Sequence, residues 1–221
     1  FITHIHSDHI VDMYQLYISG WHQGRKEPFK IIGPYGIKDF FEFQLQAFRT
    51  ELEGRKKWEF RPNENGLLYE VYEVDKDYTY DDKLAQISPF EVDHKPVEPA
   101  YGYKIEFNEK GDNKKIVISG DTRKSNNLIE QSLKANALVH EVFVGLDFDE
   151  KRMTKETLEN VAAYHTLPTE VGEVAKEALV EKLILTHFVP PVFDEEKLKN
   201  EVGEIFKGEI VIGKDLLAIE I

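Results

Sequence analysis

The chain contains no cysteine among its 221 residues. This absence excludes a disulfide scaffold, a zinc or iron–sulfur site with thiolate ligands, and a cysteine nucleophile. Long apolar runs are also absent, because no stretch approaches the ~18 apolar residues that a membrane helix needs. No repeat or low-complexity tract marks a domain boundary. We therefore expect one domain over residues 1–221, with no membrane partner and a cytoplasmic location.

Positive charge is scarce. The chain has 28 Lys and Arg residues and 41 Asp and Glu residues, which gives a formal net charge of −13. This balance argues against a broad basic face for nucleic acid, since such binding depends on Lys and Arg contacts to phosphates. The basic residues form short dispersed runs that are typical of solvated surface: Arg25-Lys26, Arg55-Lys56-Lys57 and Lys114-Lys115.

Hydrophobic periodicity predicts a mixed order of strands and helices. Residues 67–118 read as successive strands, and strands then alternate with helices up to a last strand over 216–221. This order indicates layered sheets with helices outside. Towards the start we expect a strand over 1–6, a helix over 10–19 that Gly20 ends, a short strand over 29–32 and one long helix over 37–57.

The segment His4-Ile5-His6-Ser7-Asp8-His9 concentrates metal-binding side chains. Alternate residues of an extended chain share a face, so His4 and His6 are expected on the same side. Asp8 and His9 follow, where a loop can turn them towards a second point. The alternative is a solvated polar turn, but three imidazoles and a carboxylate at this spacing suit a divalent metal.

Three further candidates, His94, Asp121 and His187, each stand where a predicted strand ends. Taken singly they are ordinary, because a strand-end histidine is often structural and Asp121 could cap a helix. Taken together they indicate a metal site, because rigid strand ends hold ligands well.

These residues resemble the motifs of the metallo-β-lactamase superfamily, and they occur in that family's order. Within it, the sequence is most similar to the ribonuclease Z and arylsulfatase-type branch. The resemblance implies a mixed α/β (α+β) fold, a four-layer αββα sandwich, and we expect the family's N-terminal strands to be missing from this chain. The supporting motifs are Thr3 to His9, Gly20-Trp21 with Gly24-Arg25, Ile32-Gly33-Pro34, Asp93 to Tyr103, Ser119-Gly120-Asp121-Thr122, Val139-His140-Glu141, Tyr164-His165-Thr166 and Leu185-Thr186-His187-Phe188.

The resemblance also implies two divalent metal ions held by seven residues. A donor set of nitrogen and oxygen suits Zn²⁺, with Mn²⁺ or Fe²⁺ as substitutes. Two such ions can hold a hydroxide between them that attacks phosphorus, sulfur or a carbonyl carbon, so we expect a metal-dependent hydrolase of ester bonds. The implied ligands are His4, His6 and His94 for the first ion, Asp8, His9 and His187 for the second, and Asp121 as the bridge.

Three residues receive catalytic roles from the same resemblance. Asp8 would also accept a proton from the attacking water, and His165 would donate one to the leaving group. Glu141 would orient His165, since a neighbouring carboxylate favours the proton-donating form of histidine. The alternative is that His165 is a loop histidine and Glu141 a surface acid. His140, one residue earlier on a strand, faces the other way and is expected to be structural.

The sequence leaves three functions open. The first is hydrolysis of a small-molecule phosphodiester or sulfate ester, which the arylsulfatase-like motifs favour. The second is tRNA 3′ processing, which the acidic balance disfavours. The third is an inactive fragment or strand-pairing module, because missing strands would leave a sheet edge open to another chain. A homodimer is also left open.

Overall fold

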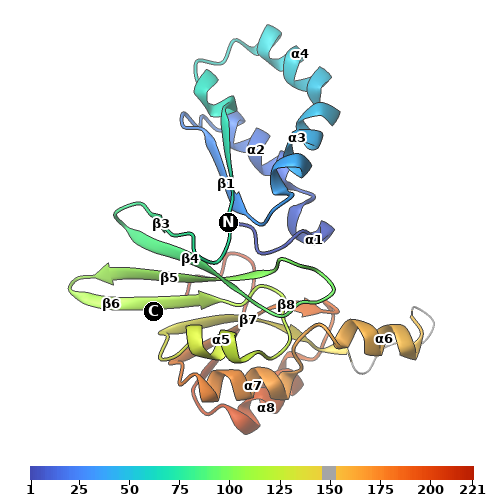
Figure 1. Ribbon diagram of the computed structural model, residues 1–221, viewed down its shortest axis with the longest axis vertical. Helices are drawn as coiled ribbons and strands as arrows, with labels where there is room; N and C mark the ends of the chain where they lie inside the picture. Colours follow the sequence, from blue (N-terminus) through green and yellow to red (C-terminus); the bar gives the residue numbers. More distant parts are fainter. Residues whose placement is uncertain (146–152) are drawn as a thin grey trace. The chain divides into compact units, whose positions relative to one another are not determined.

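The computed structural model describes residues 1–145 and 153–221, which fall into two compact units. Unit 1 is Phe1–Asp75 and unit 2 is Lys76–Ile221. Each unit has its own sheet and its own apolar core, and Figure 1 shows the elements of each. The predicted mixture of helices and strands is confirmed, whereas the single domain over 1–221 stays a prediction. In the ranges described, no helix combines the length and apolar character needed to cross a membrane.

Unit 1 is a two-stranded parallel sheet packed against helices. Its core lies between the sheet and helices α2 and α3, where Trp21, Ile31 and Phe41 are buried. In chain order its elements are α1 (Ser7–Ile10), α2 (Met13–His22), β1 (Phe29–Gly33), α3 (Ile37–Ala47), α4 (Arg49–Glu59), a 3₁₀ turn (Glu64–Leu67) and β2 (Tyr69–Glu73).

The long helix predicted over 37–57 is wrong, because it divides at Phe48. This residue leaves the helical conformation, with φ −96° and ψ 12°. Its ring stacks on Tyr14 with centroids 3.8 Å apart, and the Tyr14 hydroxyl donates to Glu51 at the start of α4. Packing on α2 therefore overrides the continuous helical pattern.

Gly20 does not end a helix as predicted, because α2 continues through it to His22. A Cβ at Gly20 would lie 2.1 Å from Nη1 of Arg25. The Arg25 guanidinium donates to the carbonyl oxygens of Tyr17, at 2.9 Å, and Gly66, at 2.8 Å. Gly20 is thus small to admit Arg25, so this part of the motif is structural within unit 1.

The first six residues are extended but do not form the predicted strand. In this stretch Ile2 donates its amide to the carbonyl of Ile32 at 2.8 Å, and no ladder follows. Asp8 and His9 lie in the one-turn helix α1, where a loop was expected.

Unit 2 is built on a seven-stranded mixed sheet in the order β3 to β9. Helices α5, α7 and α8 pack together on one face, with a core that includes Leu138 and Val174 (Figure 1). The described elements are β3 (Tyr80–Asp81), β4 (Ala85–Glu91), β5 (Tyr101–Glu109), β6 (Asp112–Ile118), α5 (Asn126–Gln131), β7 (Ala137–Phe143), α6 (Lys155–Ala162), α7 (Pro168–Glu177), β8 (Lys182–Val189), α8 (Glu195–Ile205) and β9 (Glu209–Ile212).

The strand predicted over 216–221 is wrong. The amide of Gly213 still donates to Leu185, but Leu216 has a φ of 62°, in the left-handed region. Because a strand requires extended backbone, the ladder ends with β9.

Candidate metal centre

The sheet of unit 2 gathers candidate residues at one edge. Pairs β4–β5 and β5–β6 are antiparallel, whereas β6, β7 and β8 are mutually parallel. Strands β4, β6, β7 and β8 therefore all run in one direction, and their carboxyl ends meet at the same edge. Glu141 and His187 lie two residues before these ends, and His94 and Asp121 lie three residues beyond them.

Asp121, His165 and His187 form one group in unit 2. Each offers a potential ligand atom, and these atoms lie within 4.8 Å of one another. Nε2 of His187 is 3.5 Å from Oδ2 of Asp121. His187 has a φ of 45°, a left-handed conformation that costs on the order of 1–3 kcal/mol in a residue with a side chain. Such strain is typical of functional positions, and here it falls on a predicted ligand.

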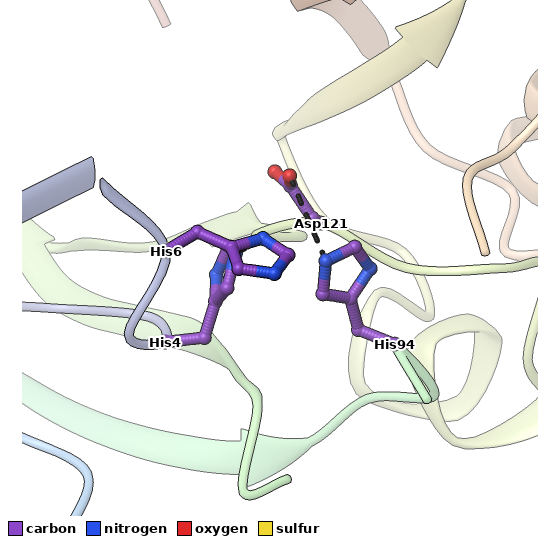
Figure 2. A group of neighbouring side chains, drawn as sticks. All are labelled: His4, His6, His94 and Asp121. Atoms are coloured by element: carbon purple, nitrogen blue, oxygen red, sulfur yellow. Dashed lines mark hydrogen bonds and ion pairs between the residues drawn. The ribbon is translucent and has the colours of Figure 1, made fainter. Parts of the chain in front are cut away.

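His94 is oriented by the main chain. Its Nδ1–H donates to the carbonyl oxygen of Tyr164 at 2.9 Å. This bond leaves Nε2 as the acceptor nitrogen, and Nε2 lies 4.0 Å from Oδ2 of Asp121, as the dashed line in Figure 2 shows. A backbone carbonyl on the second nitrogen is the usual support of a metal-binding histidine.

Glu141 and His165 form a hydrogen-bonded pair. Nδ1–H of His165 donates to Oε1 of Glu141 at 3.1 Å. The same oxygen accepts the backbone amides of Thr122, at 3.2 Å, and Thr166, at 3.1 Å. Three donors from two separate segments therefore fix this carboxylate, and Glu141 is a buried residue and not a surface acid.

Burial is the main influence on the Glu141 carboxyl. It raises the pKa of Glu141 well above the ordinary value, and the nearby Asp121 carboxylate adds to the rise. Cations bound beside Asp121 would oppose this second effect.

His140 has the structural role that the sequence predicts. It is buried, and its Nδ1–H donates to the carbonyl oxygen of Glu141 at 2.6 Å. It shares a face of β7 with Leu138 and Val142, both in the core of unit 2. Burial lowers the pKa of His140 to about 4.

The candidate ligands of unit 1 also lie close together. Nε2 of His4 is 3.0 Å from Nδ1 of His6, and Figure 2 draws both rings. The rings of His4 and His9 have centroids 4.2 Å apart. Nε2 of His9 is 3.4 Å from Oδ2 of Asp8. The four candidate ligands of this segment, His4, His6, Asp8 and His9, therefore lie near one another within unit 1.

The donor chemistry in each unit fits a divalent metal. Two nitrogens that bind one tetrahedral zinc at about 2.0–2.1 Å lie roughly 3.3 Å from each other. The 3.0 Å spacing of the His4 and His6 nitrogens is close to that value. In unit 2, the imidazoles of His94 and His187 lie 4.0 and 3.5 Å from the Asp121 carboxylate. No ligand here is a thiolate, so Mn²⁺ and Fe²⁺ fit as well.

Sequence reasoning did not identify the supporting residues. Thr122 and Thr166 hold Glu141 through their amides, and the Tyr164 carbonyl holds His94. Ser119 accepts the Glu141 amide on its hydroxyl at 3.2 Å. The available signal was adjacency, since each stands within two residues of a predicted site residue.

The chain is similar to known proteins over most of its length. The profile described as "Beta-lactamase superfamily domain" matches residues 1–188. A ribonuclease Z of Enterococcus faecalis is 31% identical over 259 residues, covering 100% of this chain and 79% of the relative. A ribonuclease Z of Mycobacterium sp. is 30% identical over 225 residues, covering 100% of this chain and 76% of the relative.

Solved structures resemble the chain in fold. Human tRNase Z, short form, has a TM-score of 0.65 at 21% identity, covering 100% of this chain and 77% of that chain. The metallo-β-lactamase fold protein YhfI of Bacillus subtilis has a TM-score of 0.64 at 21% identity, covering 96% of this chain and 73% of that chain. YhfI is described as having the metallo-β-lactamase fold, which is the fold that the sequence motifs predict.

Proposed function

Because the chain belongs to the metallo-β-lactamase superfamily, in its ribonuclease Z branch, we propose that it is a tRNA 3′-processing endonuclease. The reaction is metal-dependent hydrolysis of a phosphodiester. The observation that carries the proposal is the fixed Glu141–His165 pair beside Asp121 and His187, in a chain whose whole length matches ribonucleases Z.

This function was the second of the two enzymatic functions that the sequence left open. The comparisons support it better than hydrolysis of a small-molecule ester, because the curated relatives named above are ribonucleases Z. The arylsulfatase-type likeness receives no support from them. The net charge of −13, which disfavoured RNA, describes the average composition and not any one surface.

We assign the metal ligands as the sequence resemblance implies. The assigned ligands are His4, His6, Asp8, His9, His94, Asp121 and His187. Zn²⁺ is the proposed metal for both positions, on the grounds of the imidazole-rich donor set. When bound, a pair of such ions lowers the pKa of water to about 7 and neutralises negative charge on the phosphate.

Side chains of the protein then transfer the protons, and Glu141 keeps His165 in position. Asp8 accepts the proton of the attacking water. His165 donates a proton from Nε2 to the leaving ribose oxygen, since its Nδ1–H is committed to Glu141. The amides of Thr122 and Thr166 favour the negative form of Glu141, against the effect of burial on its pKa. In that form Glu141 favours the doubly protonated His165 that this step requires.

Cleavage of a tRNA precursor with a 3′ trailer tests the proposal. The purified chain should release the trailer, and elemental analysis should find about two metal ions per chain. Two variants, His6→Ala and His94→Ala, each remove one proposed ligand. Each should lower metal content and cleavage together. Full metal content in either variant would contradict the ligand assignment.

Two small esters separate the alternatives. Turnover of p-nitrophenyl sulfate without cleavage of the precursor would favour the small-ester function. Turnover of bis(p-nitrophenyl) phosphate together with precursor cleavage supports phosphodiester hydrolysis. Absence of metal and of all turnover would favour the inactive fragment.

A further inference from the structure

The segment that contains α4 has a charge unlike the rest of the chain. Residues 49–61 carry five basic and three acidic side chains, a net charge of +2 within a chain of net charge −13. The segment contains the run Arg55-Lys56-Lys57 and its neighbours. It contributes none of the proposed metal ligands.

Ion pairs to acids of the segment involve its three arginines, and they leave its two lysines without an acidic partner among the described residues. Arg55 bonds to Glu51 at 2.8 Å and to Glu59 at 2.7 Å. Lys56 and Lys57 are exposed, and neither pairs with an acid among the described residues. Their charge is therefore available to a phosphate.

Two exposed aromatic rings accompany these lysines. Trp58 is 74% exposed and Phe60 is 83% exposed, and no residue of α4 is buried. Nζ of Lys57 lies 5.5 Å from the centre of the Trp58 ring. Rings of this size normally gain about 1.5–3 kcal/mol by burial, so a partner that covered them would be stabilised by the contact.

The backbone presents the Phe60 ring from a fixed position. Phe60 has a φ of 46°, a conformation that aromatic residues rarely adopt. Arg61, the next residue, bonds to Glu59, donates to the carbonyl of His22 at 3.1 Å and lies over the Trp21 ring. The strain is held by these contacts, as is common at binding positions.

A hollow of about 310 Å³ continues from this segment. Basic and amide side chains line it, with one acid: Lys26, Arg61, Pro62, Asn63, Glu64 and Asn65. A cation beside a flat ring is the combination that binds single-stranded nucleic acid, because the cation contacts a phosphate and the ring stacks on a base. A cationic protein would be repelled here.

We propose that Lys56, Lys57, Trp58 and Phe60, the α4 surface, bind the RNA substrate outside the metal centre. The inference rests on the proposed function and adds where the RNA is held. Unpaired bases at loops or ends of the tRNA would stack on the two rings, while the lysines contact neighbouring phosphates.

Binding of mature tRNA, which lacks a trailer to cleave, tests the α4 surface by fluorescence anisotropy on the metal-loaded protein. Lys56→Gln with Lys57→Gln should weaken binding about ten-fold and lower the salt dependence, by about 0.7–0.9 in log–log slope per lost phosphate contact. Trp58→Ala with Phe60→Gly should weaken binding by a similar factor. Glycine tolerates the positive φ at position 60, so Phe60→Gly should not unfold the protein. Tyrosine in place of alanine at position 58 should restore binding, because its ring can also stack on a base.

Lys110→Gln with Lys176→Gln is the matched control, because it removes the same charge from exposed positions in unit 2. It should bind tRNA as the wild type does. Wild-type affinity in the α4 variants, an equal loss in the control, or no tRNA binding by the wild type would each overturn the inference. If the wild type cleaves the precursor and the α4 variants bind tRNA as tightly as the wild type, the proposed function stands and only the α4 surface is refuted. Loss of tRNA binding in those variants without any precursor cleavage by the wild type would refute the proposed function alone.

Discussion

Nδ1 of His165 and Oε1 of Glu141 lie 3.1 Å apart, and the same oxygen also accepts two backbone amides. The histidine comes from the loop before α7 and the glutamate from β7. The pair is therefore positioned by the main chain of unit 2 before any substrate binds.

Replacing His165 by Ala should lower precursor cleavage by about 10²–10⁴-fold while metal content stays unchanged, since general acid catalysis contributes about that much. Hydrolysis of bis(p-nitrophenyl) phosphate should fall far less, because nitrophenolate leaves without a proton. Parallel rate measurements and elemental analysis check this. Loss of metal in the variant would instead make His165 a ligand, a role that its grouping with Asp121 and His187 permits.

Replacing Glu141 by Gln should reduce cleavage by removing the charge that favours protonated His165. An amide oxygen can still accept the Thr122 and Thr166 amides, so thermal unfolding should change little. In the double variant with His165→Ala, the added loss should be small, because the two residues act as a unit. Fully additive losses would contradict the coupling.

Replacing Asp121 by Ala should abolish activity and remove at least one metal ion per chain. Its carboxylate is approached by both His94 and His187 in unit 2. Asp93→Ala, which removes an acid bonded to Arg123 instead, is the control and should retain metal. Turnover by the Asp121 variant would refute the bridging role.

His140 should make the protein less stable in acid. Its pKa is about 4 when folded, against an ordinary value of 6.5, so the unfolded chain binds the proton more readily between these values. The free energy of unfolding should therefore rise with pH in this window, by about 2 kcal/mol from pH 5 to pH 7 from this residue. Urea unfolding of His140→Gln at both pH values checks this, and an unchanged pH dependence would show that His140 does not titrate as described.

Sequence reasoning located the strand ends of unit 2 well. The sequence predicts strands over 101–107 and 115–118 with a turn at residues 109–112, where the structure has β5 and β6. The assignment of His94, Asp121 and His187 as ligands stays a prediction. Sequence reasoning failed where a tertiary contact decides local conformation. Phe48 leaves the helix to stack on Tyr14, and Gly20 stays inside α2 to admit Arg25.

The supports of the site were beyond sequence reasoning for a related reason. Tyr164 contributes a carbonyl and Thr122 an amide, and every residue has such groups. A side-chain pattern cannot distinguish them. They become visible only when the loops after β6 and before α7 are placed beside β7.

Because Glu141 is held by amides, positions 122 and 166 can change side chain and still serve it. Almost any amino acid supplies the same N–H, and proline is the exception. Diverged relatives could therefore lack both threonines, within what these two buried positions admit, and keep the same acid–histidine geometry. The shape of these loops is then a better guide to shared chemistry than their sequence.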